Sequence, residues 1–179
     1  MEKGNYLSPA AIGFLAGIGI AELLVYPKPT VSIIVTGSEL QKPGRVLQFG
    51  QVYESNSYSL SAALNKEGIS DPEVLEADDE LEIITQMLKK ALIKSDVVLL
   101  TGGVSSGDYD FVMEAARRCN VIQIFHKVKQ KPGKPFYFGK LQEKLVFGLP
   151  GNPSSVLSCY YNYVLPALKL LSGRENSVK

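Results

Sequence analysis

Short apolar runs that alternate with stretches of helical periodicity limit the fold of this chain more than any other feature. The runs TVSIIVTG (30–37) and SDVVLLTGG (95–103) are rich in valine, isoleucine and leucine. Continuous apolar runs of this length indicate strands that are covered on both faces. A third run between them, DPEVLEA (71–77), also predicts a strand.

Helical periodicity fills the intervals between these strands. In residues 79–94, for example, leucine or isoleucine recurs every three or four positions and forms one apolar face. Asn152 and Pro153 supply a cap and a first helical residue for the last helix. The sequence predicts helices over residues 53–66, 79–94, 110–118 and 152 to about 171.

Two further apolar runs predict antiparallel strands. Residues 121–128 (VIQIFHKV) precede residues 135–150 (PFYFGKLQEKLVFGLP), in which apolar runs flank a polar turn. In residues 135–147 the alternation of apolar and polar residues differs from the continuous apolar pattern of the buried parallel strands. We therefore expect the hairpin Pro135 to Phe147 at one edge of the sheet. The fold predicted is a three-layer α/β domain, a mostly parallel sheet flanked by helices with an antiparallel edge hairpin.

Composition narrows the class of protein. The 179 residues are 45% apolar, which is enough for one α/β domain with a real core. The net charge of +1 gives no global field that would favour nucleic acid or an acidic membrane as a partner. Two separated cysteines and one histidine argue against a disulfide scaffold and a zinc site, and fit a reducing cytoplasm. We expect a lead-in segment over 1–28, the domain over 29–173 and a tail over 174–179.

One apolar stretch, LSPAAIGFLAGIGIAELLVY (7–26), raises the question of a membrane. Its uninterrupted part, Pro9 to Ala21, is shorter than the roughly 20 residues that a spanning helix needs. A signal peptide is the alternative, but Glu2 stands beside Lys3 and the start lacks a positive region. The sequence instead predicts a buried helix, capped by Ser8, that packs on the sheet.

Three loops follow strands and should share one rim of the sheet. They are TGSEL (36–40), LTGGVSSGDYD (100–110) and FGLPGNPSS (147–155). Ligands of open parallel sheets bind at the carboxyl ends of the strands, where backbone N–H groups and helix N-termini can receive an anion. The alternative is that the glycines only permit tight turns and that the polar residues only cap helices.

Charged residues near these loops add to the evidence that the rim binds an anion. Glu39, Asp78 and Asp110 follow strands or their loops, and three converging carboxylates would suit a hard cation such as Mg²⁺. Taken singly, each is better explained as a helix cap or a solvated residue. HKVKQKPGKP (126–135) concentrates lysines, and its prolines and glycine indicate a rigid loop, although a solvated strand face explains the alternating lysines equally well. Together these groups suit phosphate and oxyanion chemistry with a metal, and neither a Walker motif nor GxGxxG is present.

The motifs as a set resemble a known family. TGSEL, GQVYESN, TGGVSSGDYD, KPGKP and GLPGNP, in this order, are similar to the central domain of the molybdopterin molybdenumtransferases, which include the E domain of gephyrin. The resemblance runs from about Tyr6 to Gly173. It implies a role in molybdenum cofactor biosynthesis: insertion of molybdate into adenylylated molybdopterin, with Mg²⁺ and with release of AMP.

The resemblance also implies roles for particular residues. Glu39, Asp78 and Asp110 would be the catalytic acids near metal and molybdate, with Glu39 and Asp110 as the metal ligands. The substrate would be bound by glycine loops and lysines, namely Thr36, Gly37, Gly102, Gly103, Ser105, Lys127, Lys131, Lys134, Pro150, Gly151 and Asn152.

The chain also departs from the family. Members are typically about twice as long or more, with an elongated region before this domain and a small β domain after it. We therefore expect a fragment, or one half of a split enzyme whose missing domains come from a separate chain. Ser38 stands where many relatives carry aspartate. A homo-oligomer is implied, a dimer or alternatively a trimer. Two other functions stay open, a molybdopterin adenylyltransferase that uses ATP and a non-catalytic module for pterin binding or self-association.

Overall fold

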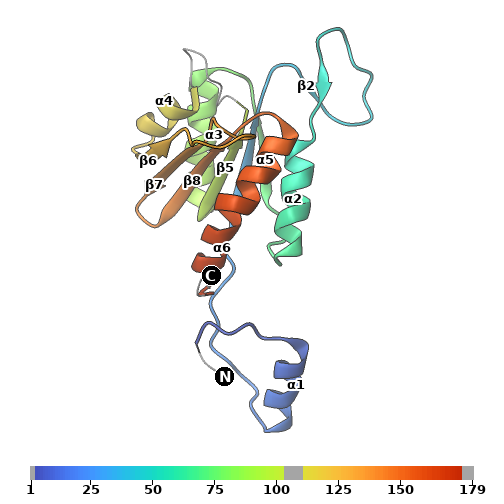
Figure 1. The fold of residues 1–179 in the computed structure, drawn as a ribbon, viewed down its shortest axis with the longest axis vertical. Coiled ribbons are helices and arrows are strands. Elements are labelled where there is room, and N and C mark those ends of the chain that lie inside the picture. Colours follow the sequence, from blue (N-terminus) through green and yellow to red (C-terminus); the bar gives the residue numbers. More distant parts are fainter. Residues whose placement is uncertain (1–2, 103–110, 175–179) are drawn as a thin grey trace.

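The computed structural model describes residues 3–102 and 111–174, and within them a six-stranded sheet is covered by helices on both faces (Figure 1). In sheet order the strands are β4 Glu73–Ala77, β1 Val31–Thr36, β5 Val97–Thr101, β8 Lys144–Leu149, β7 Tyr137–Leu141 and β6 Ile122–His126. The first four are parallel, β7 is antiparallel to β8, and β6 is antiparallel to β7. The predicted mostly parallel α/β fold with antiparallel strands toward one edge is confirmed.

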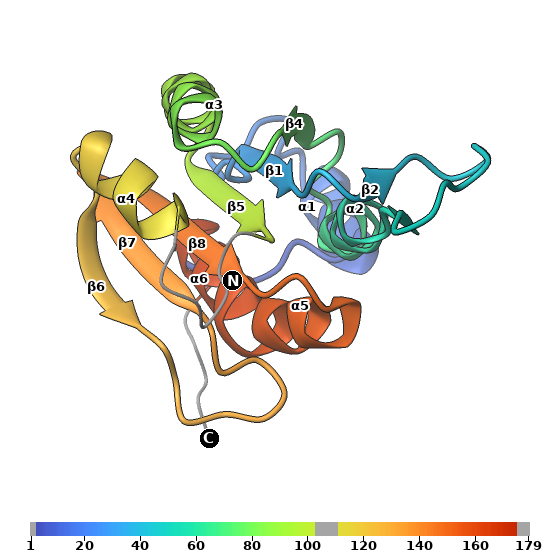
Figure 2. The same cartoon turned by 90° about the horizontal axis from the view of Figure 1, so that it is seen from above.

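The neighbouring strands β1 and β5 are buried along their whole length, as their largely apolar sequences predict. Successive side chains alternate between the sheet faces. Ile33 packs in a cluster with the helices α2 (Asn56–Lys66) and α5 (Pro153–Cys159), whereas Ile34 packs with α3 (Leu81–Lys94) and α4 (Phe111–Arg118). Figure 2 shows these two helix pairs on opposite faces of the sheet. Burying one such side chain contributes about 1.5–3 kcal/mol, so the two clusters fix the layer order.

The hairpin is formed by β7 and β8, with Gln142 at a φ of 52° in the turn between them. β8 also pairs with β5, so it joins the hairpin to the parallel part of the sheet. The antiparallel strands lie toward this edge, but the prediction that the hairpin itself forms the edge is wrong: β6 is the outermost strand, because Ile122–His126 pairs with the free edge of β7.

Helix boundaries differ from the predicted ones where local hydrogen bonds intervene. α2 begins at Asn56, because Val52–Tyr53 (β3) pairs with Leu40–Gln41 (β2) in a separate two-stranded sheet. The long C-terminal helix has the predicted extent, and Asn152 Oδ1 accepts from the Ser154 N–H at 3.0 Å as its cap. Its middle, Tyr160–Val164 (η1), is a π-helical turn that precedes α6, Leu165–Leu171. Periodicity did not predict this turn.

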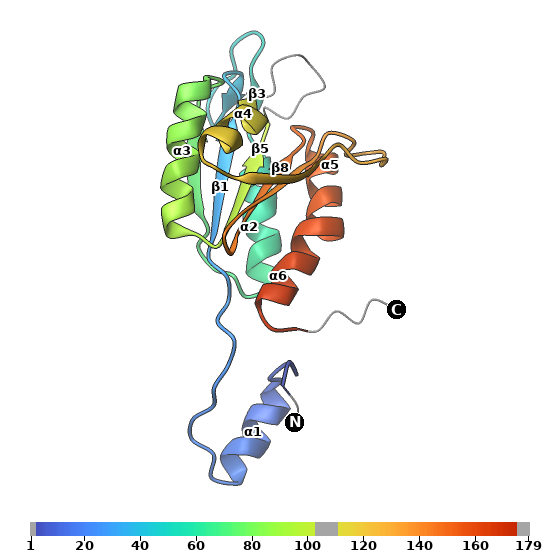
Figure 3. The same ribbon diagram turned by 90° about the vertical axis from the view of Figure 1, so that its left-hand side faces the viewer.

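The N-terminal helix α1, Pro9–Gly17, corrects one prediction. Ser8 Oγ accepts from the Ala11 N–H at 3.2 Å, so the predicted cap is confirmed. The predicted burial on the sheet is wrong: no residue of α1, all of which are described, is buried, and the helix lies apart from the layers (Figures 1 and 3). Both sheet faces are already covered by other helices. Among the described residues, no helix is long and apolar enough to cross a membrane.

Candidate functional site

The strand registers bring the predicted loops to one rim. Thr36 at the end of β1 aligns with Ala77 of β4, while Thr101 of β5 aligns with Leu149 of β8. The loops that begin after these four strands therefore start at the same edge. β6 runs parallel to β8, because each is antiparallel to β7, so the lysine loop that follows β6 starts at this rim as well.

Three of these loops approach within contact distance. Gly102 has a φ of +83°, and a Cβ placed on it would lie 2.4 Å from the carbonyl oxygen of Thr36. A Cβ on Gly151 would lie 3.8 Å from the Gly102 Cα. Thr36 Oγ1 donates to the Thr101 carbonyl oxygen at 3.4 Å. The ends of β1, β5 and β8 therefore approach one another closely and form what we call the glycine floor, in which Gly102 admits no side chain.

Asn56 joins this floor to helix α2, and the sequence analysis assigned it no role. Its Nδ2 donates to the Gly151 carbonyl oxygen at 2.9 Å, and the residue is only 8% exposed. Among the residues that the structure describes, its Oδ1 and the Thr101 Oγ1 are buried and have no hydrogen-bond partner. The motif GQVYESN contains this asparagine, so an amide at a helix start beside the rim was the available signal.

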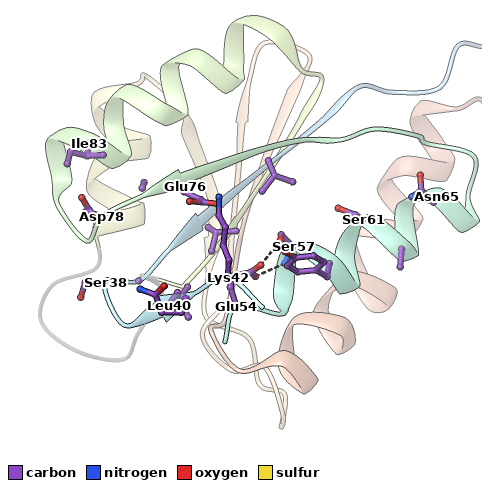
Figure 4. A pocket seen from close by; sticks show the side chains of 17 residues that line it. Ser38, Leu40, Lys42, Glu54, Ser57, Ser61, Asn65, Glu76, Asp78 and Ile83 are labelled. Atoms are coloured by element: carbon purple, nitrogen blue, oxygen red, sulfur yellow. Dashed lines mark hydrogen bonds and ion pairs between the residues drawn. The ribbon is translucent and has the colours of Figure 1, made fainter. Parts of the chain in front are cut away.

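A pocket of about 900 Å³ opens beside the floor, between the β1 loop, α2 and β4 (Figure 4). Gly37, Ser38 and Asp78 line it, which brings two predicted site residues together. Lys42 and Glu76 also line the pocket, and the Lys42 ammonium pairs with the Glu76 carboxylate at 2.7 Å. Glu39, the lysine loop and Gly151 are not part of its lining.

The acidic residues at the rim are solvent-exposed where they are described. Glu39 Oε1 lies 3.1 Å from the position of a Cβ on Gly37, and Glu39 and Asp78 are both exposed. Among the residues that the structure describes, no group of three or more acidic, histidine or cysteine side chains could hold a metal ion. The predicted residues Gly103, Ser105 and Asp110 lie outside the described residues.

The lysine loop, residues 127–134, has a fixed backbone and exposed lysines. The Lys127 N–H donates to the Phe136 carbonyl oxygen at 2.8 Å, and the Val128 N–H donates to the Lys134 carbonyl oxygen at 3.0 Å. Gly133 is buried with a φ of +100°, and a Cβ on it would lie 2.7 Å from Cys159 Sγ. The loop therefore closes on itself and presents Lys127, Lys131 and Lys134 to solvent.

Comparison with known proteins agrees with this geometry. Residues 32–170 match the family model described as "Probable molybdopterin binding domain". The chain belongs to this family. The matched residues of this molybdopterin-binding domain include all six strands of the main sheet except the first residue of β1.

Curated relatives carry a more specific name. "Molybdopterin molybdenumtransferase" of Staphylococcus aureus (strain COL) is 36% identical over 173 residues, which cover 97% of this chain and 41% of that protein. The protein of the same name from Haemophilus influenzae is 36% identical and covers 98% of this chain and 43% of its own length. The domain thus spans less than half the length of these relatives.

Solved structures give the same result. The "molybdopterin biosynthesis moea protein" of Pyrococcus horikoshii superposes with a TM-score of 0.85 at 32% identity, over 100% of this chain and 44% of that one. A "Molybdenum cofactor biosynthesis protein B" shares the fold alone, with a TM-score of 0.64 at 18% identity. The fold by itself is therefore shared by several kinds of protein.

Proposed function

We propose that this domain binds adenylylated molybdopterin and molybdate and serves as the central part of an enzyme that inserts molybdenum and releases AMP. The observation that carries the proposal is the convergence of Thr36, Gly102 and Gly151 on one rim, where the lysine loop also starts. Family membership and the name of the full-length relatives support it. The reaction belongs to the whole enzyme, because the domain covers only 41% of that relative.

The glycine floor would hold the nucleotide or pterin phosphates. Gly102 leaves the backbone open at a point where any side chain would strike Thr36, and backbone N–H groups can then approach an anion closely. Asn56 Oδ1 and Thr101 Oγ1 have no partner within residues 3–102 and 111–174, which supports a rim that completes its hydrogen bonds with a ligand. The same role is proposed for Gly37, Gly103, Ser105, Pro150, Gly151 and Asn152.

The lysine loop would neutralise oxyanions. Lys127, Lys131 and Lys134 are exposed on a short, closed loop at the rim. An ammonium group is a compact point charge that binds phosphate-like groups well. These lysines would bind molybdate and the phosphates of the substrate.

The carboxylates at the rim fit a magnesium ion by their chemistry, since Mg²⁺ prefers oxygen ligands and is usually held by one or two carboxylates. We assign this role to Glu39 and Asp110, with Asp78 as a catalytic acid nearby. The bound ion would supply positive charge at the phosphate oxygens of the adenylate. Among the described members, Glu39 and Asp78 are exposed and free to turn toward a ligand.

Assembly is part of the proposal. We infer a homo-oligomer, a dimer or alternatively a trimer, or a complex with a separate chain that supplies the remaining domains. The net charge of +1 fits a small anionic substrate rather than nucleic acid. We place the protein in the cytoplasm, where relatives of biosynthetic function would act.

The experiment is an AMP-release assay with adenylylated molybdopterin, Mg²⁺ and molybdate, run with and without a candidate chain carrying the remaining domains. Molybdate-dependent AMP release by the complex supports the proposal. ATP consumption without molybdate would identify an adenylyltransferase instead. Binding of molybdopterin without any chemistry in either arrangement would identify a binding module.

A further inference from the structure

The lysine loop packs against side chains of the C-terminal helix (α5 and η1). This contact has no part in the function proposed above. We propose that Gln130 and Tyr163 are positioning residues that hold the loop in the conformation that receives an anion. The proposal rests on the proposed function in one respect, namely that the loop lysines bind the oxyanion.

A chain of two hydrogen bonds carries the proposal. Tyr163 donates from its hydroxyl to Gln130 Oε1 at 2.7 Å. Gln130 in turn donates from Nε2 to the Pro132 carbonyl oxygen at 2.8 Å. Pro132 directly follows Lys131 and lies two positions before Lys134. A hydroxyl on the helix therefore fixes the backbone between the two lysines.

The π-helical turn supplies the tyrosine at the required place. Tyr163 lies in η1, Tyr160–Val164, and its ring packs on Phe136 with 4.6 Å between the ring centroids. π-Helical turns are rare and are frequently found at functional sites. Pro166, shortly after η1, has no N–H for regular helical bonding, which favours such an irregularity. The turn thus presents the Tyr163 hydroxyl to the loop.

A second contact closes the space beneath the loop. Gly133 has a φ of +100°, and a Cβ on it would lie 2.7 Å from both Cys159 Sγ and Gln130 Nε2. The Cys159 thiol donates weakly to the Gly133 carbonyl oxygen at 3.8 Å. The loop therefore rests directly on the helix, and Gln130 fills the position between them.

Such restraint matters because two lysines bind one anion best when their charges stay near each other. A loop that samples other conformations must be ordered when the anion binds, which lowers the affinity. Loss of one of the two hydrogen bonds that link Tyr163, Gln130 and Pro132 should lower the population of the ordered loop about two- to tenfold. We expect the loss in anion affinity to have that size.

Tyr163→Phe is the test, because it removes the hydroxyl and keeps the ring that packs on Phe136. Tyr161→Phe is the matched control, since Tyr161 lies in the same π-helical turn, is 49% exposed and has no hydrogen bond to the loop. The readouts, on the full chain, are the tryptic cleavage rate after Lys127 and Lys129 and the affinity for molybdate and for AMP by titration calorimetry. The two other lysines of the loop precede proline and resist trypsin.

We expect faster cleavage and about two- to tenfold weaker anion binding in Tyr163→Phe, with Tyr161→Phe like the wild type. Gln130→Leu should give the same result, and the double variant should add little, because the two residues act in one relay. Equal cleavage and affinity in Tyr163→Phe and Tyr161→Phe would overturn the proposal, as would faster cleavage with unchanged affinity. Failure of the proposed function looks different: Lys131→Ala and Lys134→Ala would then leave molybdate and AMP binding unchanged.

Discussion

Asn56 donates a hydrogen bond to the carbonyl oxygen of Gly151 at 2.9 Å, across 95 positions of the chain. The bond joins the start of α2 to the loop after β8, and so ties the two helices on one face of the sheet to the rim. Asn56 is 92% buried whereas Gly151 is exposed, so the bond lies at the boundary between the core and the rim.

Asn56→Ala should therefore destabilise the domain. The substitution removes a part-buried hydrogen bond to an exposed loop residue, and we expect a loss of about 0.5–1.5 kcal/mol in the free energy of unfolding. Urea denaturation followed by circular dichroism measures it. Asn65→Ala is the control on the same helix: Asn65 is exposed, and its loss should change stability by less than about 0.5 kcal/mol. Equal stability of the two variants would show that the bond contributes nothing.

Gly102→Ala tests the floor of the site. The alanine would need a φ near +83°, and its Cβ would lie 2.4 Å from the Thr36 carbonyl oxygen. We expect a loss of about 2–5 kcal/mol from left-handed strain and overpacking. Gly151→Ala is the control, since its Cβ finds its nearest neighbour at 3.8 Å, an ordinary contact. Thermal unfolding compares the two, and a Gly102→Ala protein as stable as the wild type would contradict the close approach.

Much of this fold could be predicted from the sequence because its signals are local. A strand buried on both faces is mostly apolar, and residues 31–36 and 97–101 are apolar apart from Ser32, Thr36 and Thr101. Gly102 comes directly after the strand, and a glycine in that place indicates a tight turn at the rim. The order of loops along one edge then follows from parallel pairing alone, which is why Thr36, Gly102 and Gly151 could be grouped in advance.

The remaining features depend on contacts between distant positions. Gln130 and Tyr163 are 33 positions apart, and neither periodicity nor composition marks them as a pair. The π-helical turn fits the same apolar pattern as an α-helix over so short a length. The position of α1 also had no local signal: its apolar residues predict burial, but they do not say which surface buries them.

Cys159 gives a prediction for alkaline pH. Burial raises the pKa of its thiol to about 11, above the ordinary range of about 8.5. The neutral thiol is therefore favoured in the folded state, and its contribution to stability is full below the unfolded pKa. As the pH rises from about 8.5 toward 11 the unfolded thiol ionises first, so stability falls. Cys159→Ala should flatten this fall relative to the wild type in urea titrations at several pH values, whatever its effect at pH 7.

Reagents for thiols provide an independent check at neutral pH. Burial raises the pKa of Cys119 as well, and both cysteines are buried. Because the thiolate is the reactive form, both should react slowly with a thiol reagent in the folded protein and rapidly in urea. Fast reaction of Cys159 in the folded state would contradict its packing against Gly133.

The acidic residues give the test that separates metal binding from helix capping. If Glu39 holds Mg²⁺, Glu39→Gln keeps the shape and removes the charge, so more Mg²⁺ should be needed for half-maximal AMP release by the complete enzyme or reconstituted complex.

Asp110→Asn should abolish metal-dependent cleavage and leave molybdopterin binding nearly intact. The capping interpretation makes the opposite forecast, because asparagine caps a helix as well as aspartate does. Glu80→Gln serves as the control, since Glu80 is exposed and makes no side-chain cap to α3. Wild-type dependence of AMP release on Mg²⁺ in both variants would show that Glu39 and Asp110 do not bind the metal ion. The glycine floor and the lysine loop would then remain as the proposed binding site.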